Sequence, residues 1–245
     1  MMSISSSKPV LENISFLSDS YTLTGTLHLP CAHKPPVVIG AHGLFSTGDS
    51  PKQIELARKC NDLGIAFFRF DHRGCGNSDG VFDEVTSFEA RCKDLTCAIE
   101  TICARDDIGE KIGLFGSSFG GAACISVASE LKIDALVTFA APVSSRWIMD
   151  AVENSDDNAH SDSLNKGHLK FDISEKLEKT NHILLFHGDK DTVVPFCHAQ
   201  IIYEKAGFPK KRIMQKNGDH NMSIKEHQQR FIKEASAWFQ AAFFN

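Results

Sequence analysis

Short, largely apolar runs alternate with helical patterns along most of this chain, and this alternation constrains the fold more than any other feature. The runs occupy residues 37–41, 65–70, 111–115, 135–140 and 182–186. Strands that are apolar on both faces are typical of parallel sheets that lie between layers of helices. The sequence therefore predicts an α/β fold, with a mostly parallel twisted sheet and helices on both of its faces.

An antiparallel hairpin is expected before these strands, because residues 14–29 alternate with a period of two. Pro51 and Gly64 mark the start and the C-cap of a first helix. The spacing from Thr86 to Glu89 predicts a capping box that starts a second helix. Further helices are expected over residues 119–131, 195–205 and 224–239, and a further strand over residues 212–215.

One segment, residues 143–180, separates two predicted strands by more than a normal crossover. Its middle, residues 153–166, is rich in Asp, Ser and Asn. Loops this long inside a compact domain are usually functional or disordered. We expect one domain over residues 1–245, with a small cap over the carboxyl edge of the sheet at residues 143–180. A disordered surface insertion is the alternative for the polar part.

The 245 residues carry a formal net charge of −5 at pH 7, which gives no clustered basic face for a nucleic acid. The basic stretch at residues 210–212 is interpreted as the solvated start of a strand. Residues 1–10 lack the apolar core of a signal peptide, and no apolar run approaches the ~20 residues of a membrane-spanning helix. We expect a cytoplasmic protein with no nucleic-acid partner and no integral membrane segment.

The cysteine spacings do not indicate a metal or redox site. None of the eight cysteines forms a C-x-x-C pair. A chain of this size does not need disulfides, so the cysteines are interpreted as free thiols in a reducing compartment.

A candidate nucleophile lies in the sequence Gly116-Ser117-Ser118-Phe119-Gly120, which fits the pattern G-x-S-x-G between a predicted strand and a predicted helix. The sharp strand-to-helix turn exposes the central Ser118, and side chains at the flanking glycine positions would clash. A glycine-rich dinucleotide site is the rival interpretation. It is disfavoured because the spacing is not G-x-G-x-x-G and no acidic residue ends the following strand.

A candidate oxyanion hole follows the strand at residues 37–41. The turn His42-Gly43-Leu44-Phe45 can direct a backbone N–H toward the nucleophile, together with the N–H of Phe119. Leu44 is the preferred donor and Phe45 the alternative. The side chain of His42 is interpreted as a structural brace for the turn.

A candidate acid and a candidate base follow later strands. Asp191 is the preferred carboxylate, while Asp189 is the alternative and is expected to fix its own turn instead. His220, in the loop Gly218-Asp219-His220-Asn221, is the candidate base, because the order Ser118, Asp191, His220 is that of Ser-Asp-His hydrolases. Three other histidines are given structural places: His187 at a strand end, and His198 and His227 at the surface.

Together these strings resemble the α/β-hydrolase superfamily over nearly the whole chain. The greatest similarity is to small carboxylesterases of the cinnamoyl/feruloyl esterase and monoglyceride-lipase-like (serine aminopeptidase-type) group. The strings that carry the resemblance are residues 25–30, 42–43, 71–80, 116–120, 187–195 and 218–220. The resemblance implies that the loop at residues 73–80 supports the oxyanion loop, with Cys75 where histidine is common. The cap is shorter and more polar than many caps of the family.

The resemblance implies a serine hydrolase that cleaves a small-molecule acyl ester through an acyl-enzyme, without a metal or a cofactor. The alternatives are a thioesterase, an aminopeptidase or a non-catalytic hydrolase-like binding protein. An aminopeptidase needs carboxylates for the substrate amine, which Glu153, Asp156 and Asp157 of the cap offer. Four further side chains are expected either to line an apolar acyl pocket or to serve ordinary packing: Phe45, Phe119, Trp147 and Ile148.

Overall fold

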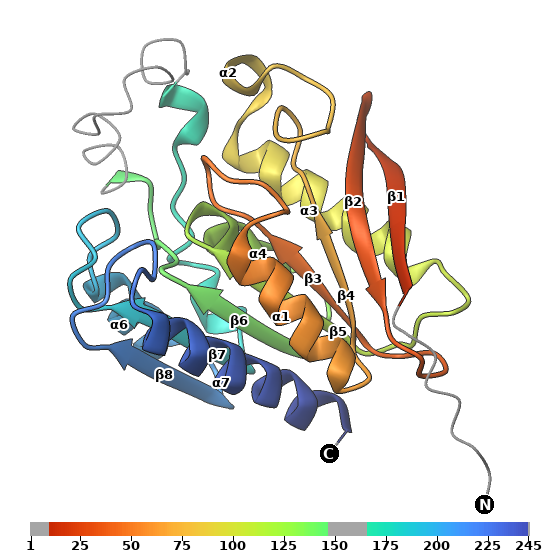
Figure 1. Ribbon diagram of the computed structural model, residues 1–245. Helices are drawn as coiled ribbons and strands as arrows, with labels where there is room; N and C mark the ends of the chain where they lie inside the picture. The colour runs from red at the N-terminus through yellow and green to blue at the C-terminus, as the bar shows by residue number, and fades with distance from the viewer. Residues whose placement is uncertain (1–9, 147–165, 245) are drawn as a thin grey trace, which may run out of the picture.

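A single eight-stranded sheet organises the computed structural model, which describes residues 10–146 and 166–244 (Figure 1). The strand order is β1-β2-β4-β3-β5-β6-β7-β8. The strands are β1 (Val10–Ser18), β2 (Tyr21–Leu29), β3 (Val37–Ala41), β4 (Ala66–Phe70), β5 (Ile112–Ser117), β6 (Ala135–Phe139), β7 (Ile183–Gly188) and β8 (Lys210–Gln215). The β1–β2 and β2–β4 pairs are antiparallel and all others parallel. The predicted fold class and the N-terminal hairpin are therefore confirmed.

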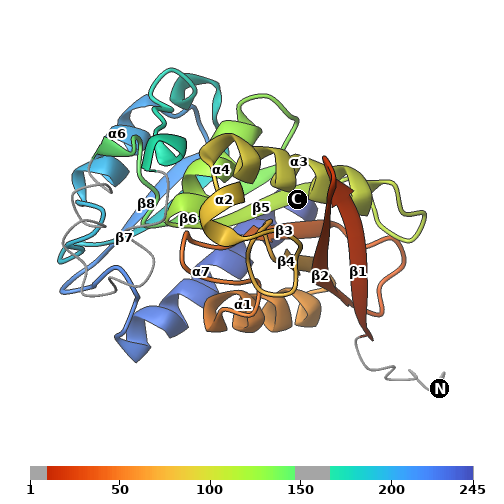
Figure 2. The same ribbon diagram turned by 90° about the horizontal axis from the view of Figure 1, so that it is seen from above.

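Helices cover both faces of the sheet (Figure 2). They are α1 (Pro51–Asp62), α2 (Phe82–Val85), α3 (Phe88–Cys103), α4 (Phe119–Ala128), α6 (Cys197–Lys205) and α7 (Lys225–Phe244), with short 3₁₀ turns η1 (Lys166–Leu169) and η2 (Leu177–Lys179). One face packs against α1 and α7, and the other against α3, α4 and α6. Each parallel strand therefore ends in a loop at one common edge of the sheet.

The two faces of the sheet form two apolar cores, and successive strand residues enter opposite ones. In β3, Val37 and Ile39 pack under α3 and α4, whereas Val38 packs under α1 and α7. In β5, Leu114 likewise packs under α3 and α4, and Phe115 packs under α1 and α7. This alternation requires apolar side chains at every position, which explains the apolar runs in the sequence.

The start of α3 differs from the expected capping box. Ser87, not Thr86, is the N-cap: it has extended backbone angles and its Oγ accepts the N–H of Ala90 at 3.0 Å. Thr86 is buried as the residue that ends α2. Two neighbouring hydroxyl residues offer the same signal, and the end of the preceding helix decides between them.

Other boundaries shift without changing the architecture. Helix α6 begins at Cys197, two residues after Pro195, and β8 begins at Lys210. Helix α7 continues past Phe239 to Phe244, because Phe243 still packs in the core beside Phe239.

The segment between β6 and β7 is described at both of its ends. An isolated antiparallel bridge joins Ser144 to Asp172, and the N–H of Ser145 donates to the carbonyl of Phe171 at 3.0 Å. Most of the polar stretch expected in a cap lies outside the described residues, and the single domain with its cap stays a prediction. All eight cysteines are free. Within residues 10–146 and 166–244, no helix is long and apolar enough to span a bilayer.

Candidate active site

Ser118 occupies a strained turn between β5 and α4. Its φ of 52° and ψ of −121° lie outside the regions that residues with a side chain usually adopt. The turn is held by two backbone hydrogen bonds, from the N–H of Ser118 to the carbonyl of Phe139 and from the N–H of Gly121 to the carbonyl of Ser118, each 2.8 Å. This strand-turn-helix geometry is the context that the G-x-S-x-G pattern predicts.

Glycine is required on both sides of Ser118 by close backbone approach. A Cβ atom on Gly116 would lie 2.5 Å from the carbonyl oxygen of Gly120. A Cβ atom on Gly120 would overlap the carbonyl oxygens of Ala41 and His42. Both glycines therefore bring α4 against β5 and β3, which sets the height of Ser118 above the sheet edge.

The side chains of Ser118, His220 and Asp191 meet at the carboxyl edge of the sheet. Nε2 of His220 lies 3.0 Å from Oγ of Ser118, and Nδ1 of His220 lies 2.8 Å from Oδ2 of Asp191. Asp191 can only accept in its ionised form, so Nδ1 carries the proton and Nε2 is free to accept from the Ser118 hydroxyl. The three residues follow β5, β7 and β8, as the sequence predicts.

Asp191 is fixed within its own loop. Its Oδ1 accepts the N–H groups of Val193 at 2.9 Å and Val194 at 2.8 Å. Nε2 of His187 donates to the carbonyl of Val194 at 2.7 Å and lies 3.4 Å from Oδ2 of Asp191. Burial would raise the pKa of Asp191, but the hydrogen bonds from His187 and His220 outweigh burial and hold it well below its usual range.

The turn bond expected for Asp189 is made by Asp191 instead. Oδ1 of Asp189 accepts the N–H of Asn217 at 2.5 Å, so it joins the loop after β7 to the loop after β8. Asp189 therefore links two loops, while Asp191 is the carboxylate that contacts His220. An aspartate side chain can accept N–H groups from its own turn or from a neighbouring loop. Only the path of the loop after β8 decides which of these bonds Asp189 and Asp191 make.

The expected surface position of His198 is wrong. His198 is buried, and its Nδ1 accepts the N–H of Val143 at 3.1 Å. Burial lowers the pKa of His198, which suits a neutral acceptor. The sequence misplaced it because α6 turns its first residues toward the chain that leaves β6. His227 is half-buried at the start of α7, and His187 packs at the end of β7 as expected.

The turn after β3 lies against Ser118. A Cβ atom on Gly43 would be 3.6 Å from Cβ of Ser118, which is ordinary van der Waals contact. Nδ1 of His42 donates to the carbonyl of Gly43 at 2.8 Å, while its Nε2 accepts the N–H of His72 at 3.2 Å. Burial lowers the pKa of His42 well below its usual range. The neutral His42 ring thus braces the turn that carries Leu44.

The loop after β4 supports the turn after β3 through Asp71. The carboxylate of Asp71 accepts the N–H of Gly48 at 2.7 Å and the N–H of Asn77 at 3.0 Å. Oγ of Ser78 donates to the carbonyl of Asp71 at 2.6 Å. A Cβ atom on Gly76, where φ is +53°, would overlap the Asp71 carboxylate. These contacts agree with the supporting role that the resemblance implies for this loop.

Sequence reasoning missed a set of charged side chains that fix the site's loops. Nζ of Lys52, at the start of α1, donates to the carbonyl of Asn221, next to His220, at 3.1 Å. Arg91 and Asp94 lie on the buried face of α3. A signal existed, because Arg91 falls three residues after the buried Phe88 and Asp94 three residues after Arg91, on a helix face where an apolar residue is normal.

The aromatic residues near the site are only partly accessible. Phe45 is exposed, and its ring lies 5.7 Å from that of Phe82. Phe119 is buried in ring contact with Phe88 at 5.6 Å and Phe171 at 5.5 Å, so its side chain is core packing. Trp147 and Ile148 lie outside the described residues. Within the part of the chain that the structure describes, no group of three His, Cys, Asp or Glu side chains could hold a metal ion.

The family is decided by residues 32–155, which match the family described as serine aminopeptidase, S33. This chain belongs to that serine aminopeptidase family of hydrolases. The matched residues include the turn after β3 and the Ser118 turn, and the resemblance inferred from the sequence motifs is confirmed.

Curated relatives and a solved structure are similar to this chain over most of its length. Bovine palmitoyl-protein thioesterase ABHD10, mitochondrial, is 28% identical over 87% of this chain and 76% of its own length. The uncharacterized protein YfhR of Salmonella typhi is 26% identical over 85% of this chain and 74% of its own length. Est1E from Butyrivibrio proteoclasticus with ferulic acid bound has a TM-score of 0.80 at 17% identity, over 95% of this chain and 100% of its own, which shows the shared fold.

Proposed function

We propose that this protein hydrolyses carboxylic esters through an acyl-enzyme, with Ser118 as nucleophile, His220 as general base and Asp191 as the carboxylate that orients His220. The observation that carries the proposal is the continuous chain of contacts from Ser118 Oγ to His220 Nε2 at 3.0 Å and from His220 Nδ1 to Asp191 Oδ2 at 2.8 Å. These are the distances that proton transfer requires.

In the first half-reaction, Ser118 Oγ attacks the ester carbonyl carbon while His220 Nε2 takes the hydroxyl proton. Asp191 stays ionised and stabilises the imidazolium that forms. His220 then gives this proton to the departing alkoxide, which leaves as the alcohol. In the second half-reaction, water attacks the acyl group with His220 again as base, and the acid and free Ser118 are released.

The oxyanion of each tetrahedral intermediate is stabilised by the backbone N–H groups of Leu44 and Phe119, with Phe45 as the alternative to Leu44. Support comes from Gly43, which lies against Ser118, and from Phe119, which follows Ser118 as the first residue of α4. Each such donor is worth ~10²–10³ in rate, because it meets charge that develops only in the transition state.

Thioester hydrolysis is the second candidate, and the named activity of the bovine thioesterase relative favours it. A thiolate leaves with less help from His220 than an alkoxide, since a thiol has a pKa near ~8.5, so the same site serves both. For an aminopeptidase, the expected carboxylates Glu153, Asp156 and Asp157 lie outside the described residues. The non-catalytic alternative, the small-molecule ester substrate and the cytoplasmic location stay predictions.

The test compares Ser118→Ala with Ser129→Ala, which changes a serine at the far end of α4. The substrates are matched oxygen esters and thioesters of graded acyl length, with aminoacyl anilides as the third set. We expect Ser118→Ala to lower kcat on the best substrate by ~10⁶ and Ser129→Ala to leave it within about threefold of wild type. Near-native turnover in Ser118→Ala refutes the proposal. Preference for anilides instead assigns the site to aminopeptidase chemistry.

A further inference from the structure

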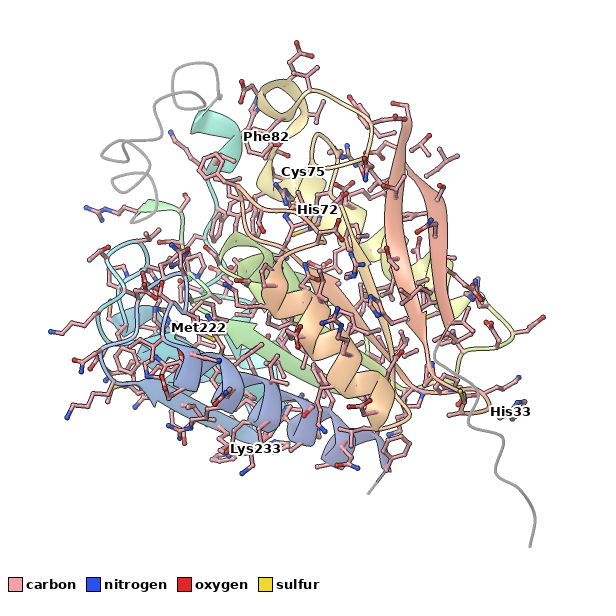
Figure 3. The ribbon with its side chains drawn as sticks, in the orientation of Figure 1. His33, His72, Cys75, Phe82, Met222 and Lys233 are labelled. Atoms are coloured by element: carbon pink, nitrogen blue, oxygen red, sulfur yellow. The ribbon has the colours of Figure 1, made fainter. Side chains whose placement is uncertain are left out.

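Arg91 is a buried cation whose contacts converge on the turn after β3. It lies on the inward face of α3 with 1% of its surface exposed. Its Nη2 donates to the carbonyl of Leu44 at 3.0 Å and to Sγ of Cys75 at 3.4 Å, while Nη1 lies 3.3 Å from Nδ1 of His42. Figure 3 labels Cys75 beside His72 in the loop that Arg91 reaches.

The positive charge of Arg91 has no ion-pair partner among the described residues. The nearby Asp94 forms an ion pair with Arg73 instead. Nε and Nη2 of Arg73 donate to Oδ1 of Asp94 at 2.9 Å and 2.7 Å, and the backbone N–H of Arg73 donates to Oδ2 of Asp94 at 3.0 Å. Nε of Arg91 is also buried without a hydrogen bond within the described part of the chain. Burying a cation without a directly paired anion costs stability, which Asp94 and Asp71 offset only from beyond ion-pair distance.

The contact with Leu44 controls the direction of a backbone donor. The peptides on both sides of Leu44 are trans, and in a trans peptide the C=O and the N–H point in opposite directions. His42 holds the carbonyl of Gly43 and thereby directs the N–H of Leu44. Arg91 holds the carbonyl of Leu44 and thereby directs the N–H of Phe45. Two neighbouring anchors therefore fix two consecutive peptides of the candidate oxyanion turn.

We propose that Arg91 is a positioning residue for acyl transfer: it locks the Leu44–Phe45 peptide and places a positive charge beside the turn that binds the oxyanion. This inference rests on the proposed function. A positive charge beside this turn interacts more strongly with the oxyanion of the transition state than with the neutral ester, so it acts mainly on the transition state and little on ground-state binding. Removing it lowers kcat and leaves KM nearly unchanged.

The experiment measures kcat and KM on an activated acetate ester for wild type, Arg91→Met and Arg91→Lys. Arg105→Met is the matched control, because Arg105 follows the same helix but pairs with Asp107 and Glu12 near the surface. Protein concentration is normalised by the end-point of fluorophosphonate labelling and folding by circular dichroism. A trifluoromethyl ketone, which forms a tetrahedral adduct with Ser118, provides the second readout.

We expect Arg91→Met to lower kcat by ~10², to keep KM within about threefold, and to weaken trifluoromethyl ketone inhibition by the same ~10². Arg91→Lys, which restores charge and one donor, recovers part of the loss, and Arg105→Met matches wild type. Wild-type kcat in Arg91→Met, or no recovery in Arg91→Lys, overturns the inference. If Arg91→Met does not fold, the neutral Arg91→Gln takes its place, and wild-type kcat in that variant overturns the inference. Turnover that survives Ser118→Ala in an otherwise wild-type chain refutes the proposed function itself, and this inference with it.

Discussion

The carboxylate of Asp191 contacts His220 with one oxygen and is fixed by its own loop through the other. Oδ2 of Asp191 lies 2.8 Å from Nδ1 of His220, while Oδ1 is occupied by the N–H groups of Val193 and Val194. Because both oxygens have assigned partners, the carboxylate cannot rotate without losing backbone hydrogen bonds. His220 is therefore presented to Ser118 in one tautomer.

Replacing Asp191 with asparagine tests this tautomer. Asp191→Asn keeps an oxygen for Val193 and Val194 but turns an NH₂ group toward His220, which moves the ring proton to Nε2 and removes the acceptor for Ser118. We expect kcat to fall by ~10⁴, measured on the ester that wild type cleaves best. Asp189→Asn is the matched control, since Asp189 bonds Asn217, and should stay within about threefold of wild type. The reverse ranking of the two variants would assign the role to Asp189.

Alanine substitutions at Gly120 and Gly43 distinguish a glycine that is needed for folding from a glycine that is needed for catalysis. Gly120→Ala forces a methyl group onto the carbonyl oxygens of Ala41 and His42, so we expect a loss of more than ~2 kcal/mol of unfolding free energy. Gly43→Ala meets only ordinary contacts at 3.6 Å, so it should keep its melting temperature but lower kcat. Chemical denaturation and ester kinetics measure the two effects. A Gly120→Ala protein as stable as wild type would contradict this packing.

The acid sensitivity of the fold includes a contribution from His28. Nε2 of His28 accepts the Nε–H of Arg69 at 2.8 Å, and burial, with the charge of Arg69, lowers the pKa of His28 to about 4. The unfolded chain binds this proton already near pH ~6.5, so stability is present above that pH and falls between pH ~6.5 and ~4. Each such histidine contributes up to about 1.4 kcal/mol per pH unit.

The variant His28→Gln keeps an acceptor for Arg69 but does not titrate. Urea unfolding as a function of pH should therefore show a shallower fall for His28→Gln than for wild type between pH ~6.5 and ~4. His33→Gln, at an exposed site, is the control and should follow wild type. Identical slopes for all three proteins would show that His28 is not coupled to folding.

The N-cap residue of α3 gives a fourth prediction, which concerns the free energy of unfolding alone. Ser87→Ala removes the oxygen that accepts the N–H of Ala90 and should lower the free energy of unfolding by about 1 kcal/mol. Thr86→Val removes a buried hydroxyl that has no hydrogen bond within the described residues, so it should be neutral or stabilising. Denaturant midpoints of the two variants measure this difference. A greater loss in Thr86→Val would restore Thr86 as the cap.

The sheet was predictable because burial on both faces leaves a direct mark on the sequence. Val37, Val38 and Ile39 are apolar in succession because they enter two different cores. Ser118 was predictable for a related reason, since the glycines around it have no room for a side chain. In both cases a local pattern reports a local constraint.

The contacts that join distant loops were not predictable in this way. Asp189 and Asp191 carry the same chemistry two residues apart, and the loop after β8 decides which of them meets His220. His198 was misplaced because its partner, the N–H of Val143, lies 55 residues earlier. Arg91 was missed because a charged residue on a helix is usually exposed, and its partners come from two other loops.

The most direct measurement is the site of covalent modification by a fluorophosphonate, found by mass spectrometry of the intact protein and of its peptides. We expect one adduct per chain, on the peptide that contains Ser118, formed quickly by wild type and ~10⁴ or more times slower by His220→Ala. Modification at another residue, or labelling of Ser118 at the same rate with and without His220, would contradict this expectation.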